Sequence, residues 1–303
     1  MSTQGFKLFK LPDLALEAVL RQSEPICVIH IGTASKKSRQ HLLPFRYLFQ
    51  NYEIRIYFTS DSYPEIVIWT KNNENLHSSF TVILKTKEDT PAPLPDSCEA
   101  IEFIIDLFLL NRIIESIAVV NWRRELIPIF DWAFSPVLSV ATFELDMPHI
   151  KDDDLAHFLK TRKVTKTLSM DVYPSHEFKT FIPFNEEDVF LLNAHWLGPY
   201  NLLLLNCVQI TMTHEKITNE QLIQFMRYWL DGLAMLKMRS FCLKGLDVRV
   251  PLILRHLPHE EHDINVREEA EGGAVIKRND GVQAVILLFP VGITPQFHVY
   301  ILR

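Results

Sequence analysis

The sequence predicts a mixed α/β chain in two parts: a three-helix module at residues 1–48 and an α/β domain with some antiparallel strands at residues 49–303. Two observations support this fold class. In the first fifty positions apolar residues recur at helical spacing. After residue 98, segments with a helical pattern alternate with segments that have a strand-like pattern. With 303 residues, 48% of them hydrophobic, the chain is long and apolar enough for its larger part to bury a core.

Two proline-led helical patterns occupy the N-terminal module. Pro12 and Pro25 each suit the first turn of a helix, where the missing N–H costs nothing. After Pro12 a stripe at three- and four-residue spacing contains Leu14, Ala15, Ala18, Val19 and Gln22. The helix predicted after Pro25 is apolar on most sides, through Ile26, Val28, Ile29 and Ile31. Three helices in about forty residues bury too little surface to hide all these side chains. We therefore expect the module to contact another protein; the alternative is packing on the chain's own larger domain.

Short strands are predicted after the module. Residues 52–58 alternate between apolar and polar side chains, and further apolar runs cover residues 66–69 and 80–85. The prolines of residues 91–95 fix the backbone and donate no N–H, so this stretch is predicted to be an extended surface loop.

Helices and strands are predicted to alternate from Cys98 onward. The clearest helix covers residues 219–236, because Thr218 and Gln221 have the spacing of a capping box. The other helices are predicted at residues 101–110, 124–133 and 152–160, and strands at residues 117–120, 140–145, 168–173, 202–212 and 238–244.

One helix plus one strand per unit is compatible with two architectures, a doubly wound sheet and a curved leucine-rich-repeat-like solenoid. A doubly wound nucleotide-binding enzyme needs a glycine-rich phosphate loop after an early strand. The chain has nine glycines and no GxGxxG or GxxxxGK[ST] motif. The sequence therefore favours a degenerate leucine-rich-repeat-like α/β domain.

The stretch from Phe9 to Leu42 resembles an F-box, which begins with Leu-Pro, continues through an Ile/Val-Leu pair and a proline-containing loop, and ends near a Ser-Lys-Arg segment. Its amino-acid sequence looks like that of the nematode-expanded F-box proteins that carry a type 2 F-box-associated domain. The positions that fall on the pattern are Leu11, Pro12, Leu16, Val19, Leu20, Pro25, Val28, Ile31, Ser35 and Lys36.

This resemblance implies binding to the Skp-type adaptor of a cullin-based ubiquitin ligase. The partner-binding residues that it implies are Leu11, Pro12, Leu16, Val19, Leu20, Pro25, Val28 and Ile31. Three positions depart from the pattern: Ser23 stands where a loop leucine is usual, Ala34 where valine is usual, and Ser38 where many F-boxes carry tryptophan.

Residues 195–290 resemble the type 2 F-box-associated domain. The resemblance lies in Leu205-Asn206-Cys207, Ile217-Thr218, Trp229 and Lys244-Gly245, and residues 276–284 look like that family's ending, with a turn at Asn279-Asp280-Gly281 between two strands.

Charge and cysteine usage indicate the kind of partner and compartment. The net charge is −6, yet residues 1–50 hold seven Lys/Arg and three Asp/Glu. A basic module favours an acidic partner surface, and an acidic remainder argues against nucleic acid. The four cysteines form no CxxC pair, no secretory signal opens the chain, and no apolar run is long enough to span a membrane. We expect a cytoplasmic or nuclear protein with no membrane partner.

No motif in the sequence requires bond chemistry. His256, His259 and His262 lack zinc-protease spacing, no GxSxG elbow occurs, and no catalytic, cofactor-binding or metal-binding residue is expected. The sequence thus predicts a non-enzymatic substrate-recognition subunit of an SCF-type E3 ubiquitin ligase, with an unknown client on the C-terminal domain. One alternative is a non-ligase interaction scaffold with a degenerate F-box. A third class is a hydrolase that uses His195 or Asp171.

Overall fold

The computed structural model describes residues 7–49, 52–59, 64–70, 79–83, 94–109, 112–245, 248–262, 272–288 and 296–302. These residues form the mixed α/β structure that the sequence predicts. The chain divides into two compact units, Met1–Ala141 and Thr142–Arg303, called here the N-terminal unit and the C-terminal unit. The predicted domain boundary at residues 48 and 49 falls inside the N-terminal unit, and the two units meet within strand β5 (Ser139–Met147).

Short helices fill the start of the N-terminal unit. Pro25 stands in the first turn of its helix as predicted, and the Ser35 side chain caps the next helix by accepting from the Ser38 N–H. The helices are η1 (Leu8–Lys10), α1 (Asp13–Gln22), α2 (Pro25–Thr33), α3 (Lys36–Leu42) and η2 (Leu43–Phe49). Their shared interior is formed by Leu16, Leu20, Val28, Ile29, Leu42, Phe45 and Phe49, all of which are buried.

Four strands and two further helices complete the N-terminal unit, and the strands lie in the order β4-β1-β2-β3. Strand β1 is antiparallel to β2 and parallel to β4, and β2 is antiparallel to β3. The elements are β1 (Tyr52–Thr59), β2 (Glu65–Thr70), β3 (Ser79–Ile83), α4 (Leu94–Phe108), β4 (Ile113–Val120) and α5 (Ile127–Ala133).

One sequence prediction in this unit is wrong in part. Residues 91–95 were expected to form a loop, but α4 begins at Leu94, so Pro95 lies in a first helical turn, where it needs no N–H partner. Residues 91–93 lie outside the described part of the chain.

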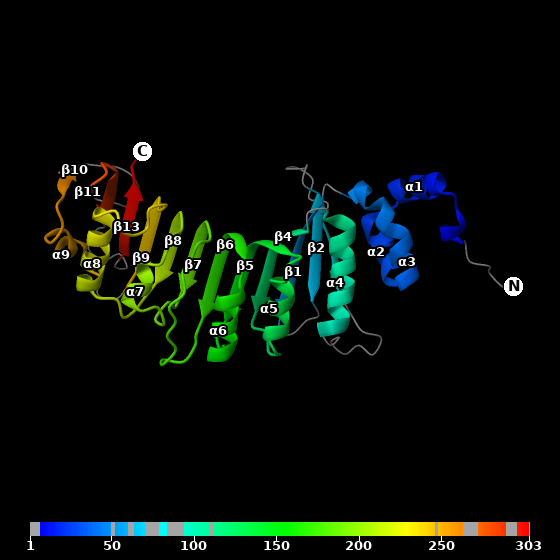
Figure 1. Cartoon of the computed structure of the whole chain (residues 1–303), viewed down its shortest axis with the longest axis horizontal. Coiled ribbons are helices and arrows are strands. Elements are labelled where there is room, and N and C mark those ends of the chain that lie inside the picture. The colour runs from blue at the N-terminus through cyan, green and yellow to red at the C-terminus, as the bar shows by residue number, and fades with distance from the viewer. Residues whose placement is uncertain are drawn as a thin grey trace. The chain divides into compact units, whose positions relative to one another are not determined.

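Helix α4 lies beside α2 and α3 in Figure 1, and α2 contacts α4 directly. Gly32 of α2 is buried at this contact, and a Cβ atom at Gly32 would lie 2.0 Å from the Phe103 ring of α4. The Arg39 guanidinium lies 5.8 Å from the centre of the same ring. The module therefore packs partly on the rest of its own unit, as the alternative reading of its apolar residues expected.

In the C-terminal unit the strands up to β9 join in chain order, and the last four strands join in the reverse order. Strands β6, β7, β8 and β9 are parallel neighbours, and antiparallel β13, β12, β11 and β10 follow β9. Figure 1 labels β6 to β9, then β13, β11 and β10, in this order. The strands are β6 (Val164–Val172), β7 (Asp188–Leu192), β8 (Gln209–Thr213), β9 (Ser240–Lys244), β10 (Glu260–His262), β11 (Gly272–Lys277), β12 (Gln283–Leu288) and β13 (Gln296–Ile301). The helices are α6 (Asp152–Thr161), α7 (Pro199–Leu202), α8 (Asn219–Leu230) and α9 (Val250–Leu254).

Each parallel strand buries alternate side chains against the helical layer. The buried side chains include Leu168 and Met170 of β6, Val189 and Leu191 of β7, Ile210 and Met212 of β8, and Phe241 and Leu243 of β9. This order agrees with a sequential repeat, and the relation to leucine-rich repeats stays a prediction.

The predicted capping box of α8 is confirmed, since Thr218 and Gln221 exchange side-chain and backbone hydrogen bonds. The helix ends at Leu230 rather than Leu236, because Gly232 adopts a positive φ of 72° that ends helical geometry. The turn at residues 279–281 joins β11 to β12, as predicted. The predicted strand at residues 202–212 is wrong in its first half, since α7 ends at Leu202 and β8 begins only at Gln209.

The contact between Gly32 and Phe103 generates a stability prediction. Gly32→Ala should lower the free energy of unfolding by about 1–3 kcal/mol, because the added methyl group overlaps the Phe103 ring. In an unobstructed helix the same change stabilises by about 0.5–1 kcal/mol. Urea denaturation checks both values.

The matched control repeats Gly32→Ala in a Phe103→Ala background, where the obstruction is gone and the change should be neutral or stabilising. An equal loss of stability in both backgrounds would show that α2 does not pack on α4 in this way.

Candidate protein-interaction sites

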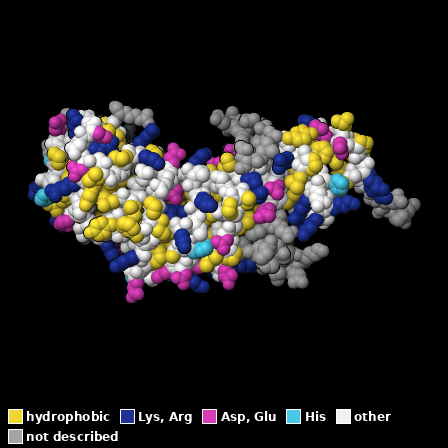
Figure 2. Space-filling model, in the orientation of Figure 1, with side chains coloured by type: hydrophobic (Ala, Val, Ile, Leu, Met, Phe, Trp, Pro, Cys, Tyr) yellow, Lys and Arg dark blue, Asp and Glu magenta, His cyan; other side chains and the backbone are white. Residues whose placement is uncertain are grey.

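Helix α1 presents an apolar stripe to the surface. Leu14 is 83% exposed and Val19 is 39% exposed, and Ala18 and Pro12 are exposed beside them. Leu16 and Leu20 point the other way and are buried. Figure 2 shows hydrophobic side chains at the surface over α1. A leucine that is almost fully exposed on a small, otherwise packed module marks a surface that a partner can cover.

The eight partner-binding residues implied by the F-box resemblance lie in three environments. Pro12 and Val19 are exposed, Leu11, Pro25 and Ile31 are half-buried, and Leu16, Leu20 and Val28 are buried in the module. In this conformation the last three support the fold and do not form part of its surface. Leu14 is the exposed residue that the resemblance missed, and the helical stripe of Leu14, Ala15, Ala18, Val19 and Gln22 was the signal for it.

Side-chain contacts hold this stripe on a defined support. The rings of Phe9 and His41 stack with their centres 4.9 Å apart, which ties η1 to α3. The Glu17 carboxylate of α1 accepts from Arg21 at 2.6 Å, and hydrogen bonds from Arg21 and Tyr47 lower the pKa of Glu17. Because Tyr47 belongs to η2, this bond ties α1 to the end of the module.

The basic cluster of the module is partly available to a partner. Lys36 and Lys37 are exposed in the first turn of α3, whereas Arg39 is half-buried and lies against Phe103. Two exposed lysines suit an acidic partner surface, as the charge balance of the first fifty residues predicts.

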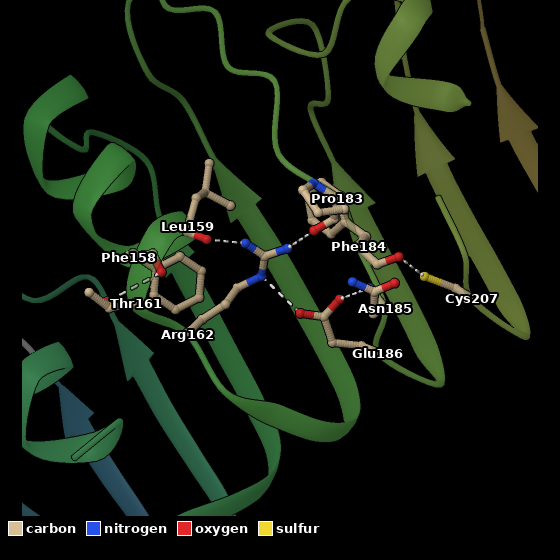
Figure 3. Close-up of polar contacts among 9 residues, drawn as sticks. All are labelled: Phe158, Leu159, Thr161, Arg162, Pro183, Phe184, Asn185, Glu186 and Cys207. Atoms are coloured by element: carbon tan, nitrogen blue, oxygen red, sulfur yellow. Dashed lines mark hydrogen bonds and ion pairs between the residues drawn. The ribbon is translucent and has the colours of Figure 1, made fainter. Parts of the chain in front are cut away.

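A buried ion pair in the C-terminal unit joins the end of α6 to the segment before β7 (Figure 3). The Nε atom of Arg162, just after α6, donates to Glu186 Oε1 at 2.8 Å, and both side chains are less than 8% exposed. The Arg162 guanidinium also donates to the carbonyl oxygens of Leu159 and Pro183. The second carboxylate oxygen of Glu186 accepts from the Asn185 N–H at 2.9 Å. Both charges are thus paired and hydrogen-bonded, which a buried pair requires.

This ion pair fastens a long irregular connection. Residues 173–187 join β6 to β7 without a helix, and single bridges pair Thr180 with Leu197 and Phe184 with Leu205. The Arg162 guanidinium lies 4.4 Å from the centre of the Phe184 ring. One arginine therefore holds the connection by charge, by hydrogen bonds and by its contact with an aromatic face.

Cys207 lies behind the same connection. Its thiol donates to the Phe184 carbonyl oxygen at 3.4 Å and is buried. Burial and then the nearby Glu186 charge raise the pKa of Cys207 from 9.0 to about 12. The thiol is accordingly protonated at neutral pH, and only the thiolate is the nucleophile.

His195 and Asp171, the residues considered for a hydrolase, have different surroundings. His195 and His214 line a pocket of about 180 Å³ together with Leu202, Lys216 and Gln221. His214 Nε2 contacts the Leu197 carbonyl oxygen at 2.9 Å, and burial lowers the pKa of His214. Asp171 instead accepts a hydrogen bond from the Asn193 amide. Within the described part of the chain, His214 contacts the Leu197 carbonyl oxygen and the Lys216 N–H, and the His195 ring lies against the His176 ring.

The described residues contain no group of three or more His, Cys, Asp or Glu side chains placed to hold a metal ion. Of the three histidines considered for zinc, His256 is exposed and His259 half-buried, and the His262 side chain lies outside what the structure describes. None of the helices described here has the length and apolar character needed to cross a membrane.

Comparison with known proteins bears on the C-terminal unit. A family model described as F-box associated matches residues 177–243, which confirms the resemblance of this region to an F-box-associated domain. No curated protein and no solved structure matches the chain. The match indicates an F-box-type substrate-binding protein in general. The F-box resemblance of residues 1–48 stays a prediction.

Breaking the buried ion pair should unfold the C-terminal unit more easily. Glu186→Gln leaves Arg162 buried without its counter-charge, so the free energy of unfolding should fall by about 3–5 kcal/mol in urea denaturation. The pair of Arg21 and Glu17, whose side chains are 57% and 23% exposed, supplies the control, and Arg21→Gln should change stability little because Arg21 is the exposed partner. Equal effects of the two changes would contradict a structural role for the Arg162–Glu186 pair.

Cys207 should resist alkylation in the folded chain. At pH 8 only about one thiol in 10⁴ is ionised when the pKa is about 12, whereas the exposed Cys27 is accessible to iodoacetamide. Since the folded pKa is raised, the stability that the neutral thiol contributes is complete below about pH 9 and declines as pH rises toward 12. Mass spectrometry of labelled peptides measures both sites; modification of Cys207 at the rate of Cys27 would refute its burial.

Proposed function

We propose that this protein is the substrate-recognition subunit of a cullin-based, SCF-type E3 ubiquitin ligase. The module of residues 1–48 docks on the Skp-type adaptor of the ligase, and the C-terminal unit holds a client protein. The F-box-associated match over residues 177–243 supports the second half of this proposal. The observation that carries the first half is the exposed apolar stripe of α1.

The docking surface combines the exposed and half-buried residues at the start of the module. Leu14 is its centre, Pro12 and Val19 flank it, and Leu11 is half-buried beside them. Leu16, Leu20 and Val28 support this surface indirectly, because their buried side chains hold together the helices that present it. A partner that covers Leu14 gains the free energy of removing an exposed leucine from water, about 1.5–3 kcal/mol.

The protein contributes proximity and no bond chemistry of its own. A client bound to the C-terminal unit is held near the ubiquitin-transferring subunit, which raises the effective concentration of client lysines around that subunit. Such a receptor needs no cofactor, no metal and no catalytic residue. It works in the cytoplasm or the nucleus, where the ligase core and its clients are found.

The second candidate is a non-ligase interaction scaffold, favoured by the departures from the F-box pattern. Ser38 stands where many F-boxes carry tryptophan, and its hydroxyl lies 2.8 Å from that of Ser35 within the cap of α3. The Ser23 hydroxyl donates to the Val19 carbonyl oxygen at 2.8 Å, so it closes α1 and offers no apolar contact. A dissociation constant for the adaptor much weaker than about 1 μM would favour the scaffold.

Leu14→Ser should weaken binding of the full chain to a purified Skp-type adaptor by about tenfold or more. The reason is that the change removes the central apolar contact of the docking surface. Isothermal titration calorimetry measures the change. Thermal unfolding should be almost unaltered, because Leu14 packs on little of its own chain.

Leu233→Ser is the matched control, since Leu233 is 71% exposed and lies in the C-terminal unit. It should leave adaptor binding unchanged. Equal affinity of the wild-type chain and the Leu14→Ser variant would refute docking through α1.

A further inference from the structure

The parallel strands of the C-terminal unit have a second face that the core does not use. Side chains that alternate with the buried ones point to this face, and every one of them is half-buried or exposed. We call this surface the open face. It consists of Thr167, Ser169 and Asp171 of β6, Asp188, Phe190 and Leu192 of β7, Gln209, Thr211 and Thr213 of β8, and Ser240, Cys242 and Lys244 of β9.

Strand register places these side chains in rows across the sheet. Ser169 pairs with Phe190, Phe190 with Thr211, and Thr211 with Cys242. Neighbouring strands lie about 4.8 Å apart, so Phe190 stands between two short hydroxyl side chains. Its ring is therefore larger than the side chains beside it in the row.

Strand β7 carries the apolar part of the open face. Phe190 is 37% exposed and Leu192, two residues further, is 42% exposed. Phe190 is the central residue of β7 and Leu192 is its last, and β7 lies between β6 and β8. Their exposure gives a partner two adjacent apolar contacts on a rigid support.

Carboxylates surround these apolar residues. Asp188 pairs in register with Thr167 and precedes Phe190 by two residues, and Asp171 pairs with Leu192. Burial and the charge of Asp171 raise the pKa of Asp146 on β5, and burial and the charge of Glu187 raise the pKa of Asp188. No ion pair joins Asp146, Asp171 or Asp188 to a basic side chain within the described part of the chain. Asp146 and Asp171 repel each other, and Glu187 repels Asp188, so an added cation at either place would relieve like-charge repulsion.

We propose that the open face binds a client segment that carries arginine or lysine beside an apolar residue. The proposal rests on the proposed function, because it assigns the place where the client is held. The apolar residue of the segment packs on Phe190 and Leu192. The cation reaches Asp171 or Asp188, and its aliphatic stem crosses the Phe190 ring.

The chemistry of the face supports this class of partner over an acidic one. A cation over an aromatic ring is attracted by the ring's negative face, and carboxylates nearby add to that attraction. An acidic segment would meet like charge at Asp146, Asp171 and Asp188, and like charges across an interface oppose association. The hydroxyls of Ser169 and Thr211 accept and donate, so they tolerate either backbone group of the segment.

A displayed library of random peptides, panned on the purified full chain, tests the proposal. Enriched peptides should carry Arg or Lys next to a large apolar residue. For a synthesised peptide of that kind, Phe190→Ser and the double change Asp171→Asn with Asp188→Asn should each weaken binding by about tenfold or more. A higher salt concentration should also weaken binding of this peptide to the wild-type chain, because the charged contacts lie near the surface.

Matched changes away from the open face separate a local effect from a general one. Leu233→Ser removes an exposed leucine that follows α8, and Asp153→Asn removes an exposed carboxylate from α6. Both should leave peptide binding within about twofold of wild type. Thermal unfolding of every variant shows whether it is folded. Enrichment of acidic peptides, no enrichment, or peptides that bind folded Phe190→Ser as well as wild type would each overturn the proposal.

Adaptor binding by the same variants distinguishes this inference from the ligase role. Changes on the open face should leave adaptor affinity unaltered, because the module of residues 1–48 carries that contact. Adaptor binding with no peptide binding would overturn the open face alone. Peptide binding with no adaptor binding would overturn the ligase role and leave the open face standing.

Discussion

The structure depends on how little a small helical module can bury. Helix α1 places Leu16 and Leu20 inside the module, and that interior has no room for a second apolar side of the same helix. Leu14 and Val19 therefore stay in water, although α2 gains cover from Phe103 of α4. Contacts within the N-terminal unit cover the apolar side chains of α2 at Gly32, but they leave Leu14 and Val19 of α1 exposed. That remaining surface makes a partner protein a physical expectation for this chain.

The C-terminal unit meets a different constraint, the need to hold an irregular connection in place. Between β6 and β7 the chain makes no helix, and the Arg162–Glu186 pair fixes the connection against the end of α6. With that connection fixed, β7 lies between β6 and β8 in parallel register. One side of the strands then buries the core, and the other side displays Phe190 among carboxylates. The proposed client site would therefore use the face opposite the one that stabilises the fold.

Much of the fold could be predicted from local patterns. The capping residues Thr218 and Gln221 and the turn at residues 279–281 act over a few positions, so sequence reasoning found them. Strand β7 was missed because its five residues lie in a stretch without a nameable motif, and its place depends on Arg162 and Glu186, 24 positions apart. The exposed residues of α1 could be predicted in part: the F-box resemblance selected Pro12 and Val19, which are exposed, but also Leu16, Leu20 and Val28, which the fold buries, whereas the helical stripe marked Leu14. Their role in docking stays a prediction. The open face was not predicted, since register and burial reveal it and sequence spacing does not.

Hydrogen–deuterium exchange of the full chain, with and without a purified Skp-type adaptor, tests the central claim most directly. If α1 is the docking element, the adaptor should slow exchange in Asp13–Gln22 and leave Thr142–Arg303 unchanged. Unchanged exchange in α1 at saturating adaptor, or slowing confined to the C-terminal unit, would contradict that claim.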